Sequence, residues 1–417
     1  MNIRVLWHRY NGPKYRYVAA TILVSLLAFA RNLFFMKSLD LASLGQVTLM
    51  ATLIMLVGFV QVGMINGAYN QYAARDREVN RRIVELMTTG VLVLIPLAII
   101  VTWMLQKTEI LVEVVWPATL AFGVAAGIAT LASTWLNNAL IADGHLGRSN
   151  LINLSAVLLS LLAAFLSLDY GLGAALSSLL LQPLIVAFAA MVLDPNLRPR
   201  SLGVHLETLE LIFRLGLMPF LAGLTVLLMY QVERWSIAAV LGSEALGEFY
   251  IVLMYMAFFG LIPDALLNVY FPQAKRAFVA HDPQLLMTFV RHHQRDLLAY
   301  CLLAVVVTVF LMPPAIERSL PAFTGSAGLV YYALPGLVLF TLRNIATMVL
   351  FSSGEMGPLL VSGMMTLSLF SASLAVLWGA GHFNLVSVLI ARGLATLPGT
   401  MLLVMAQRRQ INNMGPA

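Results

Sequence analysis

The sequence predicts an all-α integral membrane protein with twelve transmembrane helices, arranged as two six-helix bundles related by pseudo-twofold symmetry. The chain has 417 residues, of which 60% are hydrophobic and 11% charged, and its mean hydropathy is +0.88. This composition is far more apolar than that of a soluble domain. Its apolar runs are continuous over about 18–25 residues, the length at which a helix crosses a bilayer and satisfies its own backbone. Short polar motifs recur in the second half of the chain, which indicates duplication.

Twelve apolar runs, each bounded by polar or basic residues, are the predicted spans. The first follows a basic amino-terminal segment, but it is too long for a signal peptide and lacks a small-residue cleavage site. We therefore expect an uncleaved span there. In chain order the predicted spans are residues 17–37, 46–69, 83–105, 114–137, 150–168, 171–193, 211–232, 246–270, 297–316, 326–352, 358–380 and 384–406.

Two pairs of polar motifs indicate that the halves of the chain are related. Ser38–Gly45 separates the first two apolar runs, and Val240–Gly247 separates the seventh and eighth at an offset of 202 residues. Ala142–Gly147 and Ser352–Gly357 follow the fourth and tenth runs at an offset of 210 residues. Parallel repeats of this kind are related by an axis along the membrane normal, so we expect a substrate path between the halves.

The predicted organisation is an amino-terminal six-helix bundle of residues 1–193, a cytoplasmic linker of residues 194–210 and a carboxy-terminal six-helix bundle of residues 211–417. The linker is polar and contains proline, as connections between bundles do. Placing the amino terminus in the cytoplasm puts most of the 25 lysines and arginines into cytoplasmic tails and loops, where basic residues are retained. We therefore expect both termini in the cytoplasm.

One cation inside the first span is the first candidate for a substrate-binding group. Arg31, followed by Asn32, lies about 14 residues into that span, which is roughly 21 Å along a helix axis and in its outer half. A guanidinium at membrane depth costs several kcal/mol unless it faces a cavity or a partner. Arg31 therefore either lines a substrate path, snorkels to the interface, or pairs with Asp40 or Glu233.

Three further arginines lie in apolar runs and have less certain roles. Arg343 lies near the middle of the tenth span, and Arg392 lies about eight residues into the twelfth. For both, an interhelical salt bridge or hydrogen bond within one half explains the position at least as well as substrate contact does. Arg214 begins the seventh span, where anchoring at the interface explains it.

Carboxylates in the spans are candidates for ion coupling or gating, because they can hold a proton or a sodium ion. Glu233 at the outer end of the seventh span is one, and its neighbour Arg234 offers it an ion pair at the interface. Asp264 in the eighth span is another, although water can solvate it near the cytoplasmic end. Asp40, between the first two spans, completes this group.

Amide side chains in the second and eighth spans are candidate sugar ligands. Asn66 and Asn268 occupy equivalent positions in the two halves, and Gln61 adds polarity to the second span. An amide there can bind a sugar hydroxyl or can cap the helix.

Enzymatic and cofactor chemistry is not expected. The single cysteine, Cys301, allows neither an intrachain disulfide nor a cysteine metal site, and the histidines are too scattered for a metal centre. No glycine-rich phosphate loop is present, so transport would not be driven by ATP bound to this chain. We expect no cofactor, no metal and no nucleic-acid partner.

The segment Glu233–Tyr250, followed by Ile262–Leu266 and Tyr270–Pro272, resembles the polysaccharide-exporting members of the MOP flippase superfamily, whose fold is MATE-like. In that family an acidic–basic pair precedes a leucine–glycine turn and a tyrosine, and a proline-bearing segment follows. Leu44–Gly45 and Val62–Met64 match the pattern in the first half. The resemblance extends over essentially the whole chain and is closest to Wzx-type flippases.

The resemblance implies a transporter of the bacterial inner membrane that moves an undecaprenyl-diphosphate-linked oligosaccharide to the periplasmic leaflet by alternating access. The oligosaccharide would be a repeat unit of the O-antigen of lipopolysaccharide or of an exopolysaccharide. The implied cavity is lined by the first, second, seventh and eighth spans. Arg31 would hold the diphosphate or an acidic sugar, and Glu233 and Arg234 would lie at the outer rim. Candidate partners are membrane lipids, a polysaccharide polymerase, a chain-length regulator and a coupling proton or sodium ion.

Three alternatives remain open. A MATE-like multidrug or cation extruder would favour an acidic cavity, whereas this interior holds more cations than carboxylates. A polysaccharide polymerase or ligase would need a sizeable outward loop, and the predicted loops are short. A structural protein of the assembly machinery is the third alternative. Lipid II flippases, another branch, carry an arginine in the second span, where this chain has only Gln61 and Asn66.

Overall fold

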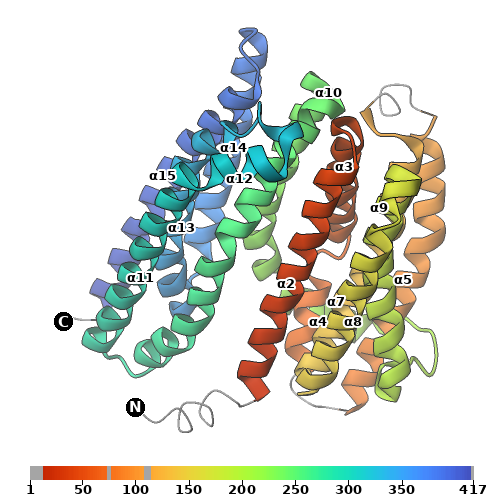
Figure 1. Cartoon of the computed structure of the whole chain (residues 1–417). Coiled ribbons are helices and arrows are strands. Elements are labelled where there is room, and N and C mark those ends of the chain that lie inside the picture. Colours follow the sequence, from red (N-terminus) through yellow and green to blue (C-terminus); the bar gives the residue numbers. More distant parts are fainter. Residues whose placement is uncertain (1–12, 73–76, 108–113, 415–417) are drawn as a thin grey trace, which may run out of the picture. The chain divides into compact units, whose positions relative to one another are not determined.

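The computed structural model describes all residues except 1–12, 73–76, 108–113 and 415–417, and it describes the backbone but not the side chains of 13–18, 265, 268 and 272. Every regular element in this described part is helical. The chain divides into two compact units, unit 1 (Met1–Phe220) and unit 2 (Leu221–Ala417). Figure 1 shows the helices of each unit.

The described residues of unit 1 form six long or medium helices, one short helix and the start of a seventh long one. The short helix α4 follows α3, and η1 follows α9 directly. The elements are α2 (Pro13–Ser38), α3 (Leu41–Phe59), α4 (Met64–Tyr72), α5 (Arg77–Leu105), α7 (Pro117–Ala142), α8 (Leu146–Ala164), α9 (Ser167–Leu193) and the 3₁₀ turn η1 (Pro195–Leu197).

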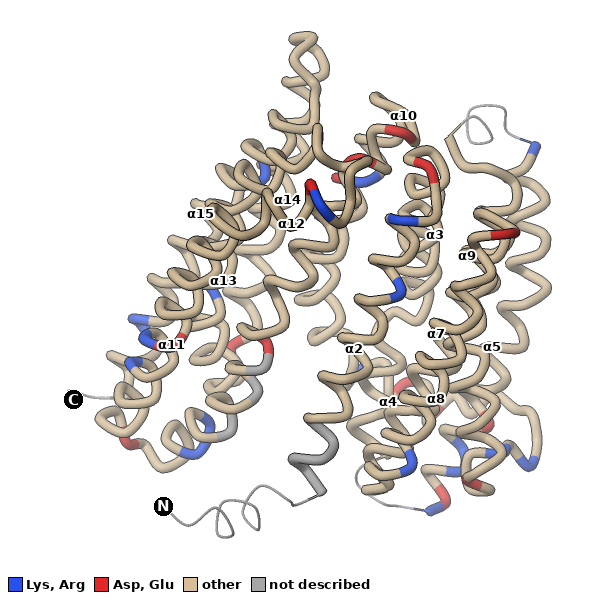
Figure 2. Tube along the Cα trace, viewed as in Figure 1, with Lys and Arg blue, Asp and Glu red and all other residues tan. Residues whose placement is uncertain are grey.

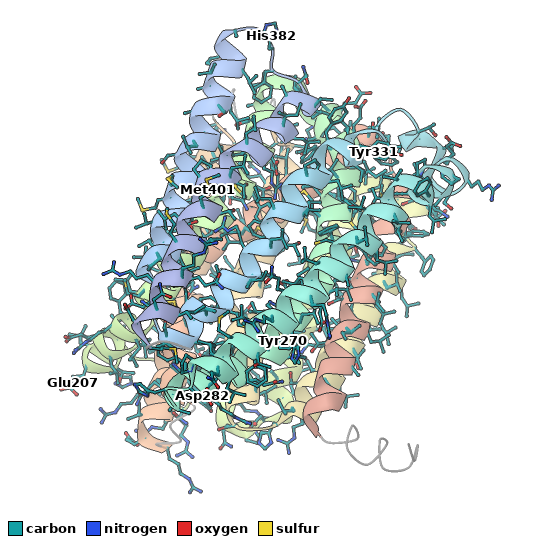
Figure 3. The ribbon with its side chains drawn as sticks, turned by 90° about the vertical axis from the view of Figure 1, so that its left-hand side faces the viewer. Glu207, Tyr270, Asp282, Tyr331, His382 and Met401 are labelled. Carbon is teal, nitrogen blue, oxygen red and sulfur yellow. The ribbon has the colours of Figure 1, made fainter. Side chains whose placement is uncertain are left out.

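Unit 2 contains most of α10 and the helices that follow it. Asp282 caps the amino terminus of α11 by accepting a hydrogen bond from the backbone N–H of Leu285 at 2.9 Å (Figure 3). Asn384 and Ser387 form a capping box at the start of α15. The elements are α10 (Leu206–Val279), α11 (Pro283–Phe310), α12 (Met312–Ser319), η2 (Pro321–Phe323), α13 (Leu329–Ser353), α14 (Gly357–Gly379) and α15 (Leu385–Asn413).

Eleven of the described helices are long and apolar enough to cross a membrane, and one of them covers two predicted spans. Helix α10 has 74 residues. At 1.5 Å per residue it would extend about 111 Å as a single helix, several times the thickness of the hydrocarbon core. Gly242 interrupts it with φ 90° and ψ 173°, a conformation that favours glycine. The predicted spans 211–232 and 246–270 lie on either side of this break, which accounts for the difference in count.

The continuous span predicted over residues 46–69 is wrong, because the helix breaks there. Helix α3 ends at Phe59 and α4 begins at Met64. Between them Val62 has φ 39° and Gly63 has φ 84°. The side chain of Gln61 accepts a hydrogen bond from the backbone N–H of Ile65 at 2.8 Å, so it caps the new helix.

Backbone contact between α4 and the first turns of α10 requires glycine at three positions in unit 1. A Cβ at Gly67 would lie 1.7 Å from the carbonyl oxygen of Ile212, and one at Gly216 would lie 1.9 Å from the carbonyl oxygen of Gly63. The N–H of Gly67 donates a hydrogen bond to the carbonyl oxygen of Gly63 at 3.0 Å, so the first turn of α4 holds the two glycines together at this contact. Small residues at such a contact let membrane helices approach closely.

We expect Gly67→Ala to lower the free energy of unfolding by about 1–3 kcal/mol, because the added methyl overpacks against a backbone that has no rotamer to change. Gly90→Ala in α5 is the matched control, since its Cβ would meet nothing within 4 Å. That control should be neutral or stabilising by about 0.5–1 kcal/mol. The midpoint of thermal unfolding in detergent measures both. A Gly67→Ala variant as stable as Gly90→Ala would contradict the contact.

The outer faces of the helices carry large apolar side chains, and the charges lie mainly at helix ends. Phe188 on α9 is 69% exposed, and Met401 on α15 is 63% exposed (Figure 3). Figure 2 shows that Lys, Arg, Asp and Glu are sparse along the middle of the helices. Lipid is the solvent in which such faces are stable, and the chain is therefore a multi-pass integral membrane protein.

Candidate functional site

In unit 1, the cation predicted to bind substrate lies buried among three helices. Arg31 on α2 is 7% exposed, and its Nη1 donates hydrogen bonds to Ser160 Oγ at 2.6 Å and to Gln182 Oε1 at 2.8 Å. Ser160 on α8 donates in turn to the carbonyl oxygen of Ser178 on α9 at 2.6 Å. The two groups that receive these hydrogen bonds from Arg31 are uncharged.

Helical spacing explains why Arg31 points inward. Phe35 lies four residues later on the same face of α2 and is fully buried. On α8, Ala156 lies four residues before Ser160, and both are fully buried. Arg31 and Ser160 therefore both lie on the buried faces of their helices, where they are in contact.

In unit 2, a buried ion pair joins α10 to α15. Arg392 Nη1 donates to Glu233 Oε2 at 2.7 Å, and the two side chains are 10% and 1% exposed. The same nitrogen lies 3.2 Å from Met256 Sδ, and the guanidinium carbon lies 4.8 Å from the centre of the Tyr230 ring. Glu233 is thus held by a residue 159 positions away in sequence, and not by Arg234 as the sequence suggested.

Two other interior arginines of unit 2 have no carboxylate partner within the described part of the chain. Arg234 has its Nε and Nη1 buried without a hydrogen-bond partner. Arg343 is 7% exposed and lies 5.3 Å from the centre of the Phe340 ring, a cation–π contact. Among the described residues, the interior of unit 2 therefore holds three arginines and one buried carboxylate, and that carboxylate is paired with Arg392. The interior of unit 2 has an excess of positive charge.

The remaining predicted residues take more ordinary positions. Asp40 accepts a hydrogen bond from the N–H of Ser43 at 2.7 Å and caps α3, which is a structural role. Asp264 and Arg214 are exposed. Asn32 and Asn66 are partly buried, and the side chain of Asn268 lies outside the described residues.

The structure adds partners that the sequence did not single out. Ser160 and Gln182 are isolated polar residues inside apolar runs, a signal that could have marked them as partners of a buried cation. Tyr230 and Met256 carried no such signal, because aromatic and methionine residues are common in membrane helices.

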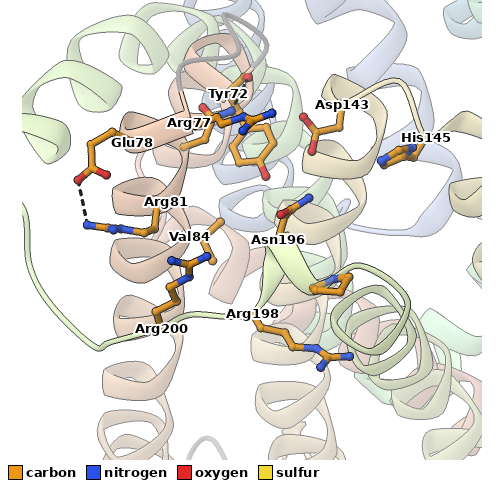
Figure 4. A pocket seen from close by; sticks show the side chains of 12 residues that line it. Tyr72, Arg77, Glu78, Arg81, Val84, Asp143, His145, Asn196, Arg198 and Arg200 are labelled. Atoms are coloured by element: carbon orange, nitrogen blue, oxygen red, sulfur yellow. Dashed lines mark hydrogen bonds and ion pairs between the residues drawn. The ribbon is translucent and has the colours of Figure 1, made fainter.

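Unit 1 also contains a cavity of about 890 Å³, and all of its lining residues except Val84 lie outside the predicted spans. Figure 4 shows its side chains, which come from α4, the start of α5, the turn between α7 and α8, and the segment after α9. The lining is polar and rich in arginine. It consists of Tyr72, Arg77, Glu78, Asn80, Arg81, Val84, Asp143, His145, Pro195, Asn196, Arg198 and Arg200.

The sequence matches no protein-family model and none of the curated proteins, so the comparisons rest on structure. The chain is similar to the inward-facing conformation of a multidrug resistance MATE family transporter of the MOP superfamily, with TM-score 0.68, 16% identity, and 94% of this chain and 95% of that chain covered. It is similar to the lipid II flippase MurJ in an inward closed conformation, with TM-score 0.68, 11% identity, and 95% and 89% covered.

A third similar structure is a MOP superfamily transporter from Pyrococcus furiosus, described as having a binding pocket of reverse polarity that suggests a different function. Its TM-score is 0.61 at 16% identity, with 97% of each chain covered. All three are transporters, and each matches over nearly the full length of both chains. The chain has the fold of the MOP superfamily of membrane transporters.

Proposed function

We propose that this chain is a flippase that moves an anionic, undecaprenyl-diphosphate-linked oligosaccharide from the cytoplasmic to the periplasmic leaflet by alternating access. The observation that carries the proposal is the charge of the interior. Among the described residues of unit 2, the interior holds the arginines Arg234, Arg343 and Arg392 but one buried carboxylate, Glu233, which is paired with Arg392. Cations at membrane depth are costly unless an anion is present for part of the transport cycle, and a diphosphate supplies that anion.

Arginine suits this substrate because its planar guanidinium binds phosphate oxygens in a bidentate manner and stays charged at any physiological pH. Arg31 in unit 1 is held in place by Ser160 and Gln182, so its orientation is set before substrate arrives. Pre-organisation of this kind lowers the entropy lost on binding. The lipid tail can remain in the bilayer while the headgroup crosses.

The similar structures are of transporters, and these transporters include a lipid II flippase and a multidrug resistance transporter. An extruder of organic cations would need buried acidic groups that are open to the substrate, whereas Glu233, the one carboxylate buried among the described residues of unit 2, is already bound by Arg392 at 2.7 Å. The similar transporter whose reversed pocket polarity suggests a different function supports the view that pocket polarity differs among proteins of this fold.

The membrane and the partners follow from the same proposal. The protein would lie in a bacterial inner membrane with both termini in the cytoplasm, and it would deliver its cargo to a polysaccharide polymerase and a chain-length regulator. A proton or sodium ion is the proposed source of energy. Asp264 is exposed and makes no ion pair within the described part of the chain, so it is a better candidate than Glu233 for the coupling carboxylate.

Reconstituted vesicles test the proposal. Purified protein should accelerate the flipping of a fluorescent undecaprenyl-diphosphate oligosaccharide at least tenfold over protein-free vesicles. Quenching by a reagent that cannot cross the membrane measures the flipped fraction. Efflux of ethidium from the same vesicles is the parallel measurement for the MATE-like alternative. Ethidium efflux without lipid flipping would overturn the proposal in favour of a cation extruder.

A further inference from the structure

The arginine-rich cavity of unit 1 has two chemically different groups of side chains. One group is two carboxylates and an imidazole, from Asp143, His145 and Asp194, and the other is the lining arginines, together with Glu78. The ligand atoms of the three residues all lie within 4.8 Å of one another. Asp143 and His145 line the cavity directly, and Asp194 ends α9 just before the lining segment that begins at Pro195.

Asp194 supplies the observation that points to a missing ligand. It is 1% exposed, and its Oδ1 accepts a hydrogen bond from the N–H of Asn196 at 3.0 Å. Its Oδ2 is buried and has no hydrogen-bond partner among the residues that the structure describes. His145 Nε2 and Arg148 Nη1 each lie 3.7 Å from that oxygen, close enough for attraction but too far for a hydrogen bond. A buried carboxylate oxygen without a donor costs free energy unless a ligand reaches it.

Tyr72 fixes the other carboxylate. The side chain of Tyr72 is buried, and its hydroxyl hydrogen-bonds to the carboxylate of Asp143. Tyr72 is itself anchored, because its ring packs edge-on against Trp135 with centroids 5.6 Å apart. The carboxylate of Asp143 is therefore held at the cavity and is not a mobile surface group.

The four arginines of the cavity divide into engaged and available groups. Arg81 pairs with Glu78 at 2.9 Å, and Arg198 donates to the carbonyl oxygens of Met191 and Val192 at the end of α9. Arg77 and Arg200 form no ion pair within the described residues. These two exposed guanidiniums line the cavity and are open to an anionic ligand.

We propose that this cavity binds a diphosphate group together with a divalent cation. Asp143, His145 and Asp194 hold the cation, and Arg77 and Arg200 bind the phosphate oxygens. Mg²⁺ and Mn²⁺ prefer oxygen ligands and commonly bind through one or two carboxylates plus phosphates of the substrate. A cation alone would be disfavoured among so many arginines, and an anion alone would be repelled by the carboxylates. A cation and a diphosphate bound together would give the carboxylates a positive partner and the arginines a negative one.

Arg148 competes with the cation for the Oδ2 of Asp194. Its side chain is 50% exposed, so it can move aside into water when a cation binds. The competition makes a specific prediction, because Arg148→Gln should strengthen metal-dependent binding. If the cluster only joined the ends of α7 and α9 by ion pairs, Arg148→Gln would not strengthen metal-dependent binding.

The proposal deepens the proposed function, since the diphosphate of a lipid-linked glycan is one source of such a group, and a soluble nucleoside diphosphate is another. In the first case the cavity would receive the headgroup at the membrane surface before transport. The basic residues that gather at this end of unit 1 (Figure 2) are of the kind retained on the cytoplasmic side. The binding test below does not depend on transport.

Retention of radiolabelled pyrophosphate by the purified, full-length protein in detergent tests the cavity. With Mn²⁺ present, retention should be at least tenfold higher than in EDTA. Asp194→Asn should lower it at least tenfold while preserving the acceptor for the N–H of Asn196. Arg77→Gln combined with Arg200→Gln should do the same. Arg148→Gln should raise affinity about threefold or more. Size-exclusion chromatography verifies that each variant is folded.

Asp169→Asn, a carboxylate change elsewhere in unit 1, is the control and should bind like wild type. Retention that is insensitive to EDTA or to Asp194→Asn would overturn the proposal.

A competition experiment separates the two sources of the diphosphate. If undecaprenyl diphosphate displaces pyrophosphate at a lower concentration than ADP does, the cavity binds a lipid headgroup. If ADP displaces it at the lower concentration, the cavity binds a soluble diphosphate. Displacement by neither would overturn the proposal. Lipid flipping without metal-dependent retention would leave the proposed function intact and refute the cavity alone.

Discussion

Glu233→Ala should lower the free energy of unfolding by about 3–5 kcal/mol, because it leaves Arg392 charged and buried without its partner. Glu233 is 1% exposed, and its Oε2 lies 2.7 Å from Arg392 Nη1. Water cannot replace the carboxylate at that depth. The expected result is a large fall in the midpoint of thermal unfolding, together with a reduced yield of monodisperse protein in detergent.

A neutral double variant separates the ion pair from the shape of the site. Glu233→Gln combined with Arg392→Gln removes both charges and keeps polar side chains of similar length. Its loss of stability should be smaller than the sum of the two single changes, because neither charge is left alone. Additive losses, or a Glu233→Ala variant as stable as wild type, would show that the pair does not hold α10 to α15.

The helices were predictable because each apolar run is long enough to cross a bilayer and bounded by polar residues. The break between Phe59 and Met64 was not. The apolar run 46–69 contains glycines, but glycine is tolerated in membrane helices and does not place a break. The break lies where the backbone of Gly63 meets that of Gly216 in α10, far away in sequence. Hydropathy indicates whether a segment lies in lipid or in water, but it does not indicate which other helices pack against the segment.

The partner of Glu233 illustrates a second limit. The sequence places Arg234 beside it, yet neighbouring residues on a helix point about 100° apart and do not face each other. The actual partner, Arg392, comes from α15. An ion pair between helices depends on which faces meet, and a single sequence does not state that. The excess of interior cations over carboxylates, in contrast, was visible in the sequence, since it requires only counting within the spans.

The cavity of unit 1 was missed for a related reason. Tyr72 ends α4, and Asp143 and Asp194 directly follow α7 and α9, so in the sequence the three lie at separate, ordinary helix ends. Only the packing of α4, α7 and α9 brings them within reach of one another. Their residue types are common at membrane surfaces, so no spacing rule marks them.

Arg31→Ala should abolish surface polysaccharide, a loss of at least tenfold, while the protein remains in the membrane. The arginine supplies the positive charge that the proposed function assigns to the diphosphate or an acidic sugar. Its removal leaves Ser160 with the hydrogen bond that it donates to Ser178, and Gln182 is only partly buried. The loss should therefore fall on transport more than on folding.

Two companion variants distinguish charge from packing. Arg31→Lys keeps the charge without the bidentate geometry and should retain part of the activity, whereas Arg31→Met keeps the volume without the charge and should behave like Arg31→Ala. Ser160→Ala removes one hydrogen-bond partner of the guanidinium and no charge, so its effect should be the mildest of the four. Immunoblots of membrane fractions report protein level, and gel analysis of cell-surface glycan reports function. Normal glycan with Arg31→Met would show that the charge of Arg31 has no part in transport.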